Sequence, residues 1–273
     1  MKKFLQLFSI YLVLFLGGIL MVLPFFWMVS TSLKSAGEAI AIPPTLLPSN
    51  WLFSNYEEAL EAAPFARYFV NSVIVTVAST AGELFTSILA AFAFAKLKFW
   101  GKDLIFLILL ATMMVPGELM TIPNFVTLAN WDLINTYWAL IIPWLASVFS
   151  IFTLKQSFES IPDALYYSAK VDGSSDWRVL WEMMVPLSQS SIVAVMILKV
   201  IGSWNSFMWP LIVTNDTSLR TLPVGLQAFT TEAGTKFELL MAASTIVIVP
   251  MVIIYLLLQR YIIQGISNSG LKG

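Results

Sequence analysis

Residues 161–187 read IPDALYYSAKVDGSSDWRVLWEMMVPL and form the longest ordered interval between two apolar runs of the chain. In the first half, small and apolar residues recur at intervals of three and four, which predicts a short helix. That face comprises Ile161, Ala164, Leu165, Ser168 and Ala169. Gly173 can adopt the positive φ with which helices often end. Ser174 or Ser175 can then cap a second helix, with Asp176 near its positive end.

The second half of the stretch repeats the same spacing with bulky residues and ends at a proline. Its members are Trp177, Leu180, Trp181, Met184 and Val185, followed by Pro186. The whole stretch therefore predicts helix, sharp turn, helix, with a small-residue face first and an aromatic face second. An ordinary amphipathic hairpin, lying on a membrane surface or packed on membrane spans, is the competing interpretation, because Asp-Gly turns are common.

This stretch resembles the EAA loop of ABC-importer permeases, which reads Glu-Ala-Ala, two further residues, Asp-Gly, and a proline after a hydrophobic run. The matching positions are Tyr167, Ser168, Ala169, Asp172, Gly173 and Pro186. The upstream Ile161-Pro162 is similar to the carbohydrate-type branch of the family. Tyr167 stands where the family has Glu, and Ser168 stands where it has its first Ala.

In that family the loop is the coupling helix that docks into a groove on a cytoplasmic ATPase. The resemblance implies that the ATPase-coupling residues are Pro162, Ala164, Leu165, Tyr167, Ser168, Ala169, Asp172 and Gly173. Because the Glu is missing, the resemblance supports docking but gives no basis for a salt bridge from position 167.

The composition indicates a polytopic membrane protein. Hydrophobic residues make up 58% of the chain, charged residues 11%, and the mean hydropathy is +0.82, whereas soluble domains carry roughly 25% charged residues. There is no cysteine and no histidine. This excludes disulfides, Cys/His metal sites and any Ser-His or Cys-His catalytic pair. The net charge of −1 gives no support to nucleic-acid binding.

The apolar runs predict an all-α fold with six transmembrane helices and one domain over residues 1–273. The expected spans are about 5–30, 69–95, 104–122, 137–154, 192–213 and 239–258, with a cytoplasmic coupling loop over 155–190. The first run exceeds the about 7–15 apolar residues of a signal peptide, so we expect an uncleaved span. With both termini in the cytoplasm, ten Lys and Arg residues fall inside and four outside, which is the positive-inside bias.

Candidate substrate-path residues lie in and beside the spans. WNSFMWPLIV, residues 204–213, resembles a stretch of carbohydrate permeases, and MMVPGELMTIP, residues 113–123, resembles the third span of the family. The candidates are Trp204, Asn205, Trp209 and Glu118. A sugar has an apolar C–H face and a ring of hydroxyls, so aromatic faces with a buried amide suit it. Alternatively, Trp204 and Trp209 pack or lie at an interface.

Two charged residues lie inside predicted spans. An intramembrane acid is a functional hypothesis by default, and helix packing is the alternative for Glu83. Lys199 can extend toward the inner surface. The sequence leaves the roles of both open.

The sequence lacks a Walker-type glycine loop with Lys-Ser/Thr, so it has no such route to bind ATP. The resemblance implies the permease subunit of an ATP-driven, binding-protein-dependent importer of sugars, oligosaccharides or related polyols. It implies a second homologous permease subunit that shares the translocation path, two copies of an ATP-binding subunit, and an extracytoplasmic solute-binding protein. ATP and Mg²⁺ belong to the partner ATPase, and this chain is expected to hold no cofactor, metal or catalytic residue. The expected location is a bacterial or archaeal plasma (inner) membrane.

Two other functions fit parts of the sequence. Lys199 and Ser203 are four positions apart and therefore share one helix face, which fits a Ser/Lys hydrolase with a desolvated Lys as base. The second alternative is a passive channel, which transports solute without nucleotide. A passive channel would leave the ordered hairpin at residues 161–187 without a function.

Overall fold

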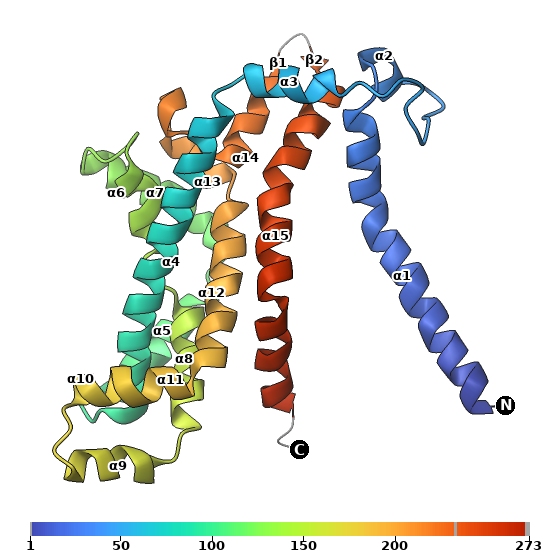
Figure 1. The fold of residues 1–273 in the computed structure, drawn as a ribbon. Coiled ribbons are helices and arrows are strands. Elements are labelled where there is room, and N and C mark those ends of the chain that lie inside the picture. The colour runs from blue at the N-terminus through green and yellow to red at the C-terminus, as the bar shows by residue number, and fades with distance from the viewer. Residues whose placement is uncertain (1, 232–233, 271–273) are drawn as a thin grey trace. The chain divides into compact units, whose positions relative to one another are not determined.

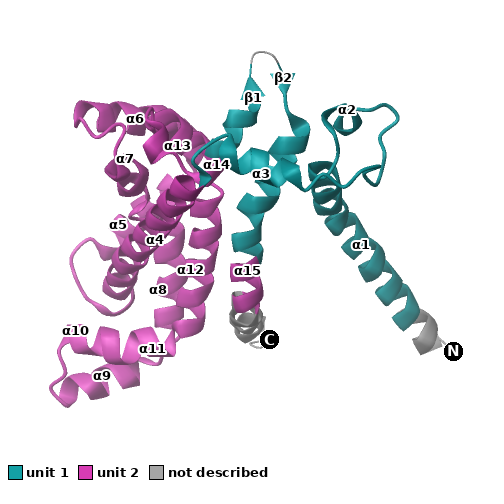
Figure 2. Ribbon diagram, turned by 45° about the horizontal axis from the view of Figure 1, so that its top comes forward, with its two compact units in different colours: residues 1–65, 225–252 teal, residues 66–224, 253–273 magenta. Residues whose placement is uncertain are grey.

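The computed structural model describes residues 2–231 and 234–270, and Figure 1 shows a fold built from helices with one small two-stranded ribbon. The all-α prediction is confirmed. Within the described residues, three helices are long and apolar enough to cross a membrane, or up to six if each bent pair counts as one span. The chain divides into two compact units, Met1–Phe65 with Gly225–Val252, and Ala66–Val224 with Ile253–Gly273 (Figure 2). The single domain over residues 1–273 stays a prediction.

The first unit holds α1, the segments that follow it, and the first part of α15. Its elements are α1 (Lys2–Ser32), α2 (Ala36–Ala39), α3 (Ser54–Glu61), η5 (Leu226–Phe229), the antiparallel strands β1 (Thr230–Thr231) and β2 (Gly234–Thr235), and α15 (Phe237–Gly270), which runs on beyond the unit. Lys34 is buried after α1, where its Nζ donates to the carbonyl of Thr45 at 2.6 Å. The side-chain amide of Asn55 donates to the carbonyls of Ser32 and Lys34 at 2.9 and 2.8 Å. These bonds fold the interval between α1 and α3 into an ordered cap.

The second unit is arranged around α4. Its elements are α4 (Phe65–Lys96), α5 (Lys102–Thr112), η1 (Gly117–Met120), α6 (Thr121–Asn130), α7 (Tyr137–Ile141), η2 (Ile142–Trp144), α8 (Val148–Glu159), α9 (Asp163–Val171), α10 (Asp176–Val179), the π-helix η3 (Leu180–Met184), α11 (Val185–Leu187), α12 (Gln189–Trp204), α13 (Met208–Val213), η4 (Thr217–Leu219) and α14 (Leu222–Gly225). Small polar residues of α4 are buried, among them Ser72, Ser79 and Ser87. Small residues let helices approach closely in lipid.

A close approach between α4 and the segment before α8 depends on Gly82. A Cβ placed on Gly82 would overlap Cδ2 of Leu145, so any larger residue requires that side chain to move. Thr86, one turn further along α4, donates its hydroxyl to the carbonyl of Leu145. The glycine therefore sets how closely the two segments pack.

Three of the predicted spans are bent or interrupted. The interval 104–122 is not one straight helix, because α5 ends at Thr112 and the helical segment that begins at Gly117 is turned by 94°. Pro116 lacks an N–H and disfavours helical geometry at the residue before it, which accounts for the break. The 11 residues of α5 extend about 16 Å, against a hydrocarbon thickness of about 30 Å. The interval 137–154 bends by 44° between Trp144, the end of η2, and Val148, the start of α8. The interval 192–213 is interrupted between the end of α12 at Trp204 and the start of α13 at Met208, and α12 is itself bent by 80° from the preceding segment 176–187.

At the end of α4 remote from Lys96, a buried amide orders the chain before α14. The side chain of Asn71 donates to the carbonyls of Ser218 and Arg220, both at 2.8 Å, and accepts the hydroxyl of Tyr137 at 2.6 Å. Asn71 is fully buried, so satisfying its amide is required there. These bonds join three separate segments of the second unit.

Candidate functional site

The 161–187 hairpin has the helix, turn, helix form that the sequence predicts. α9 ends in a Schellman motif, in which the N–H of Ser174 donates to the carbonyl of Ala169 and the N–H of Gly173 to that of Lys170, at 2.9 and 3.1 Å. Gly173 has φ +80°, a conformation that glycine adopts without steric cost. Ser175 caps α10, because its hydroxyl accepts the N–H of Arg178 at 3.3 Å.

A π-helical turn precedes Pro186, which the sequence marked as the end of the second helical pattern. The N–H of Val185 donates to the carbonyl of Leu180, five residues back. Pro186 cannot donate to the carbonyl four residues before it and its ring would crowd that carbonyl, so a wider turn at this point fits the sequence. The chain then bends by 80° into α12.

The hairpin is fixed to the ends of α4 and α8 by a hydrophobic cluster and by one lysine. The cluster joins Tyr166, Val179, Leu180 and Met184 of the hairpin to Phe92, Leu154 and Phe158 of α4 and α8. Lys96 donates to the carbonyl of Ile161 at 2.9 Å and to the carboxylate of Asp163 at 2.6 Å. Its side chain is only 3% exposed, so it acts as a buried clamp between α4 and the start of α9.

Tyr166 joins the two helices of the hairpin. Its hydroxyl donates to Oδ1 of Asp176 at 2.7 Å, and Nζ of Lys170 lies 3.1 Å from the same oxygen. Burial, followed by the bond to Asp176, raises the pKa of Tyr166 to about 12. The Tyr166 hydroxyl, followed by the Lys170 ammonium, holds the pKa of Asp176 below its usual value.

The face that the spacing predicted for α9 is mostly exposed in the structure. Ile161 is buried and Ala169 half-buried, but Ala164, Leu165 and Ser168 are exposed, and Tyr166 takes the inward position. α9 contains two adjacent tyrosines, Tyr166 and Tyr167, and the sequence gives no signal that shows which of the two is buried. The bulk of Tyr166 fills the cluster better than the small residues that the spacing selected.

The predicted coupling residues lie on the outer side of the hairpin, apart from the half-buried Ala169. The exposed members are Pro162, Ala164, Leu165, Tyr167, Ser168, Asp172 and Gly173. Leu165, Tyr167 and Val171 expose 45%, 52% and 88% of their surfaces. The outer side therefore offers apolar side chains on a rigidly held helix, and exposed apolar clusters often mark interaction surfaces.

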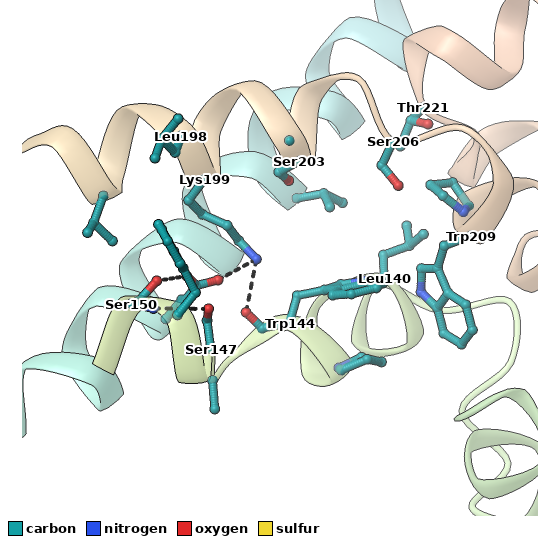
Figure 3. Close-up of a pocket in the computed structure, with 18 of the residues that line it drawn as sticks. Leu140, Trp144, Ser147, Ser150, Leu198, Lys199, Ser203, Ser206, Trp209 and Thr221 are labelled. Carbon is teal, nitrogen blue, oxygen red and sulfur yellow. Dashed lines mark hydrogen bonds and ion pairs between the residues drawn. The ribbon is translucent and has the colours of Figure 1, made fainter. Parts of the chain in front are cut away.

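A cavity of about 500 Å³ lies in the second unit, between α4, the η2–α8 segment, α12 and α13 (Figure 3). Trp144 and Trp209 meet edge to face in its wall, with ring centroids 6.1 Å apart. Hydroxyl-bearing residues also line it, namely Ser72, Ser147, Ser150, Ser203, Ser206 and Thr221. The volume is within the range of small-molecule sites.

Glu83 and Lys199 form an ion pair in the wall of this cavity. Nζ of Lys199 lies 2.7 Å from Oε2 of Glu83 and donates to the carbonyl of Trp144 at 3.1 Å. Ser150 donates to Oε1 of Glu83 at 2.6 Å. The side chains of Glu83 and Lys199 are 6% and 14% exposed. The sequence left the roles of Glu83 and Lys199 open, and the structure shows that the two residues pair with each other.

This pair removes the basis for a Ser/Lys hydrolase. The ammonium of Lys199 is paired with Glu83 and points to Trp144 (Figure 3). The hydroxyl of Ser203 lies 3.2 Å from that of Ser79. A lysine base must present its nitrogen to the serine hydroxyl, whereas the nitrogen of Lys199 is bonded to Glu83 and to the carbonyl of Trp144.

The predicted substrate-path residues are not brought together. Trp209 lines the cavity and donates its Nε1–H to the carbonyl of Ala139 at 3.0 Å. Trp204 is buried outside the lining, edge to face with Phe69. Asn205 is exposed at the C-terminal cap of α12, so the prediction of a buried amide is wrong.

Glu118 is also exposed, in η1, and outside the cavity lining. Sequence reasoning did not select Trp144, Ser147 or Ser150, which line the cavity. Pro143 inside a predicted span was the available signal, because the break beside it exposes backbone carbonyls to a cavity.

Comparison with known proteins places these features in context. Residues 83–268 match the family model described as "Binding-protein-dependent transport system inner membrane component". The arabinooligosaccharides transport system permease protein AraQ of Halalkalibacterium halodurans is 33% identical over 245 residues, covering 89% of this chain and 86% of AraQ. The sn-glycerol-3-phosphate transport system permease protein UgpE of Yersinia pestis is 29% identical over 267 residues, covering 95% of each chain.

The fold also matches a chain in the crystal structure of a bacterial ABC transporter involved in the import of the acidic polysaccharide alginate. The match covers 94% of this chain and 96% of that chain, with a TM-score of 0.82 and 22% sequence identity. At this identity the likeness concerns the fold.

Proposed function

The chain belongs to the family of binding-protein-dependent transport system inner membrane components, and on that premise we propose that it is the permease subunit of an ATP-driven importer of sugars or oligosaccharides. A relative named for arabinooligosaccharide transport supports the sugar class. The chain would form the translocation path together with a second homologous permease subunit. Two ATP-binding subunits and an extracytoplasmic solute-binding protein complete the proposed assembly, with ATP and Mg²⁺ held by the ATP-binding subunits.

One observation carries the coupling part of the proposal. The hairpin presents exposed apolar side chains outward, including Leu165 and Tyr167, while Lys96 and the hydrophobic cluster clamp its inner side to α4 and α8. A loosely held loop would absorb the motion of a partner, but a clamped helix passes that motion to the helices behind it. We therefore assign ATPase coupling to Pro162, Ala164, Leu165, Tyr167, Ser168, Ala169, Asp172 and Gly173.

The proposed mechanism is a two-state equilibrium. Closure of the ATPase dimer around ATP moves α9, and the second half of the hairpin moves with it because Tyr166 and Asp176 join the two. Trp181, which stacks on Phe85 of α4 at 6.3 Å, carries the motion to that helix. The pathway then opens outward and accepts solute, and hydrolysis resets it. The ATPase can shift the equilibrium only by its differential contact with the two states.

The proposed orientation places both termini and the hairpin in the cytoplasm of a bacterial or archaeal cell, with the chain in the plasma (inner) membrane. The excess of Lys and Arg in the segments assigned to the inside supports it. The hairpin is then on the side where ATP is present.

Co-purification tests the assembly. The chain is tagged in its native cell, extracted in mild detergent, and the proteins that accompany it are identified and counted. We expect a second permease chain and two copies of an ATP-binding chain. Recovery of the chain alone, under conditions that keep known complexes together, would contradict the proposal and favour a passive channel, whose solute flux needs no nucleotide.

A further inference from the structure

The cavity of the second unit is electrically balanced. Of the described residues that line it, Glu83 and Lys199 carry charge, and they neutralise each other at 2.7 Å. The ammonium of Lys199 is held further by the carbonyl of Trp144, and the carboxylate of Glu83 by the hydroxyl of Ser150. A solute in the cavity therefore meets a dipole and not a free charge.

The pair keeps some hydrogen-bonding capacity. A lysine ammonium has three donors, and a carboxylate has about four acceptor positions. Lys199 uses one donor on Glu83 and one on the Trp144 carbonyl, and the two oxygens of Glu83 each accept one of the bonds described above. A hydroxyl can donate to the remaining acceptors and accept from the remaining donor without separating the pair.

The other end of the cavity is aromatic and hydroxylated. Figure 3 shows Ser206, Thr221 and Trp209 away from the end that Lys199 and Ser150 occupy. The hydroxyl of Thr221 is buried and has no hydrogen-bond partner within the described chain. A buried hydroxyl without a partner is costly unless another molecule satisfies it.

We propose that this cavity binds an uncharged saccharide and that the Glu83–Lys199 pair excludes anionic solutes. This inference rests on the proposed sugar-importer function and specifies its substrate class. An anion bonded to the remaining donor of Lys199 would also face the carboxylate of Glu83, which cancels the attraction of the ammonium. To gain that attraction it would have to draw Lys199 away and leave the carboxylate buried without its cation, which is strongly unfavourable. A neutral sugar stacks on Trp144 or Trp209 and bonds to the intact pair. The distinction matters within the family, because relatives are named for an anionic glycerol phosphate as well as for oligosaccharides.

The absence of cysteine in this chain permits a direct test of charge in the cavity. Ser206→Cys is introduced into the tagged chain of the assembled importer, and its reaction rates with cationic, neutral and anionic methanethiosulfonates are compared. Ser160→Cys, at an exposed position, supplies the reference rates. We expect the cationic and anionic rates at position 206, relative to the reference, to agree within about threefold, because opposite charges at this separation largely cancel.

Neutralising one partner should then reveal the other. In the Ser206→Cys background, Glu83→Gln should raise the ratio of the anionic to the cationic reaction rate by about tenfold. Lys199→Gln should lower that ratio by about as much. The double variant Glu83→Gln/Lys199→Gln should return the two rates to near equality. This variant also tests the proposal if a single variant does not fold. Unchanged rate ratios in all three variants would overturn the assignment of charge balance to this pair.

Protection by saccharides completes the test. A panel of neutral disaccharides, built from glucose, mannose and galactose, is compared with the corresponding uronate disaccharides, using the neutral reagent. At least one neutral disaccharide should slow the reaction, and no uronate should do so unless Glu83→Gln is present. Protection by a uronate with the pair intact would overturn this inference and leave the proposed function standing. If no saccharide protects although the ATP-binding subunits are present, the inference falls together with the sugar part of the proposed function, and coupling stands.

Discussion

Gly173 shows how one residue sets the geometry of the hairpin. Its positive φ lets two backbone bonds close α9, and a Cβ placed on it would meet no heavy atom within 4 Å. The demand on this position is therefore conformational and not steric. The sequence predicted this glycine correctly, because an Asp-Gly step after a helical pattern has a known geometry.

We expect Gly173→Pro to abolish uptake while the protein remains inserted in the membrane. Proline cannot adopt φ +80° and removes the N–H that donates to Lys170, a local cost of about 3 kcal/mol or more. Uptake of labelled solute, with membrane content measured by immunoblot, checks this. Gly173→Asn is the matched control, because asparagine tolerates the left-handed region; normal uptake by the proline variant would refute the coupling assignment.

The hairpin should be sensitive to acid and to strong alkali. The folded pKa of Asp176 lies below its ordinary value of 3.8, so its contribution is present above about pH 4 and is lost as the pH falls through the folded value. Tyr166 has the opposite sign. Its contribution is complete below its ordinary pKa of 10.0 and is lost as the pH rises through about 12.

Limited proteolysis of the hairpin across pH checks this window. We expect protection from about pH 4 to about pH 10. Tyr166→Phe removes the hydroxyl that donates to Asp176 and should lower the stability of the hairpin by about 1–2 kcal/mol at neutral pH. A flat profile in the wild-type protein, or a Phe variant as resistant as wild type at neutral pH, would show that this contact does not hold the two helices together.

At the scale of elements, helix existence was easier to predict than helix continuity. Long apolar runs gave α1, α4 and α15 directly, because their composition requires burial in protein or lipid. The bends after α5 and beside η2 depend on prolines and on close packing such as that of Gly82 with Leu145.

In the candidate site, too, local features were predictable and contacts between distant segments were not. Trp209 was found from its local motif, but the pairing of Glu83 with Lys199 joins distant parts of the chain, which spacing cannot reveal.

We expect Lys96→Ala to separate ATP hydrolysis from uptake, because this lysine clamps α9 to α4. ATPase activity of the assembled complex should remain within about twofold of wild type, while uptake falls by about tenfold, as expected for the loss of a charged hydrogen bond. Lys98→Ala is the control, since Lys98 is exposed, has the same charge and lies two residues away. Equal effects of the two substitutions would indicate a general role of positive charge and not a mechanical clamp.

At the scale of the whole molecule, the chain is a set of apolar helices that needs a membrane and, by our proposal, other subunits. The 18-residue apolar window of α1 has none of its residues buried within the described structure, and its exposed side chains include Phe15, Leu20 and Met21. The charge distribution favours cytoplasmic termini, and the orientation is directly measurable.

Single cysteines in this cysteine-free chain should report the orientation. Thr231→Cys should react with a membrane-impermeant maleimide in intact cells, once any outer barrier is made permeable. Ser174→Cys, in the hairpin turn, should react only after the plasma membrane is opened. The opposite pattern would invert the proposed topology and remove the hairpin from the compartment that contains ATP.

The Glu83–Lys199 pair also constrains how the chain is made. On the order of a hundred residues separate its two members, which at about 5–20 residues per second is roughly 5 to 20 s of synthesis. During that interval α4 has left the ribosome with a carboxyl group whose partner does not yet exist. Inserting a lone acid at the centre of a helix costs about 2.5–3.5 kcal/mol. We therefore expect α4 to reach its final placement in lipid only after α12 supplies Lys199 as the partner of Glu83.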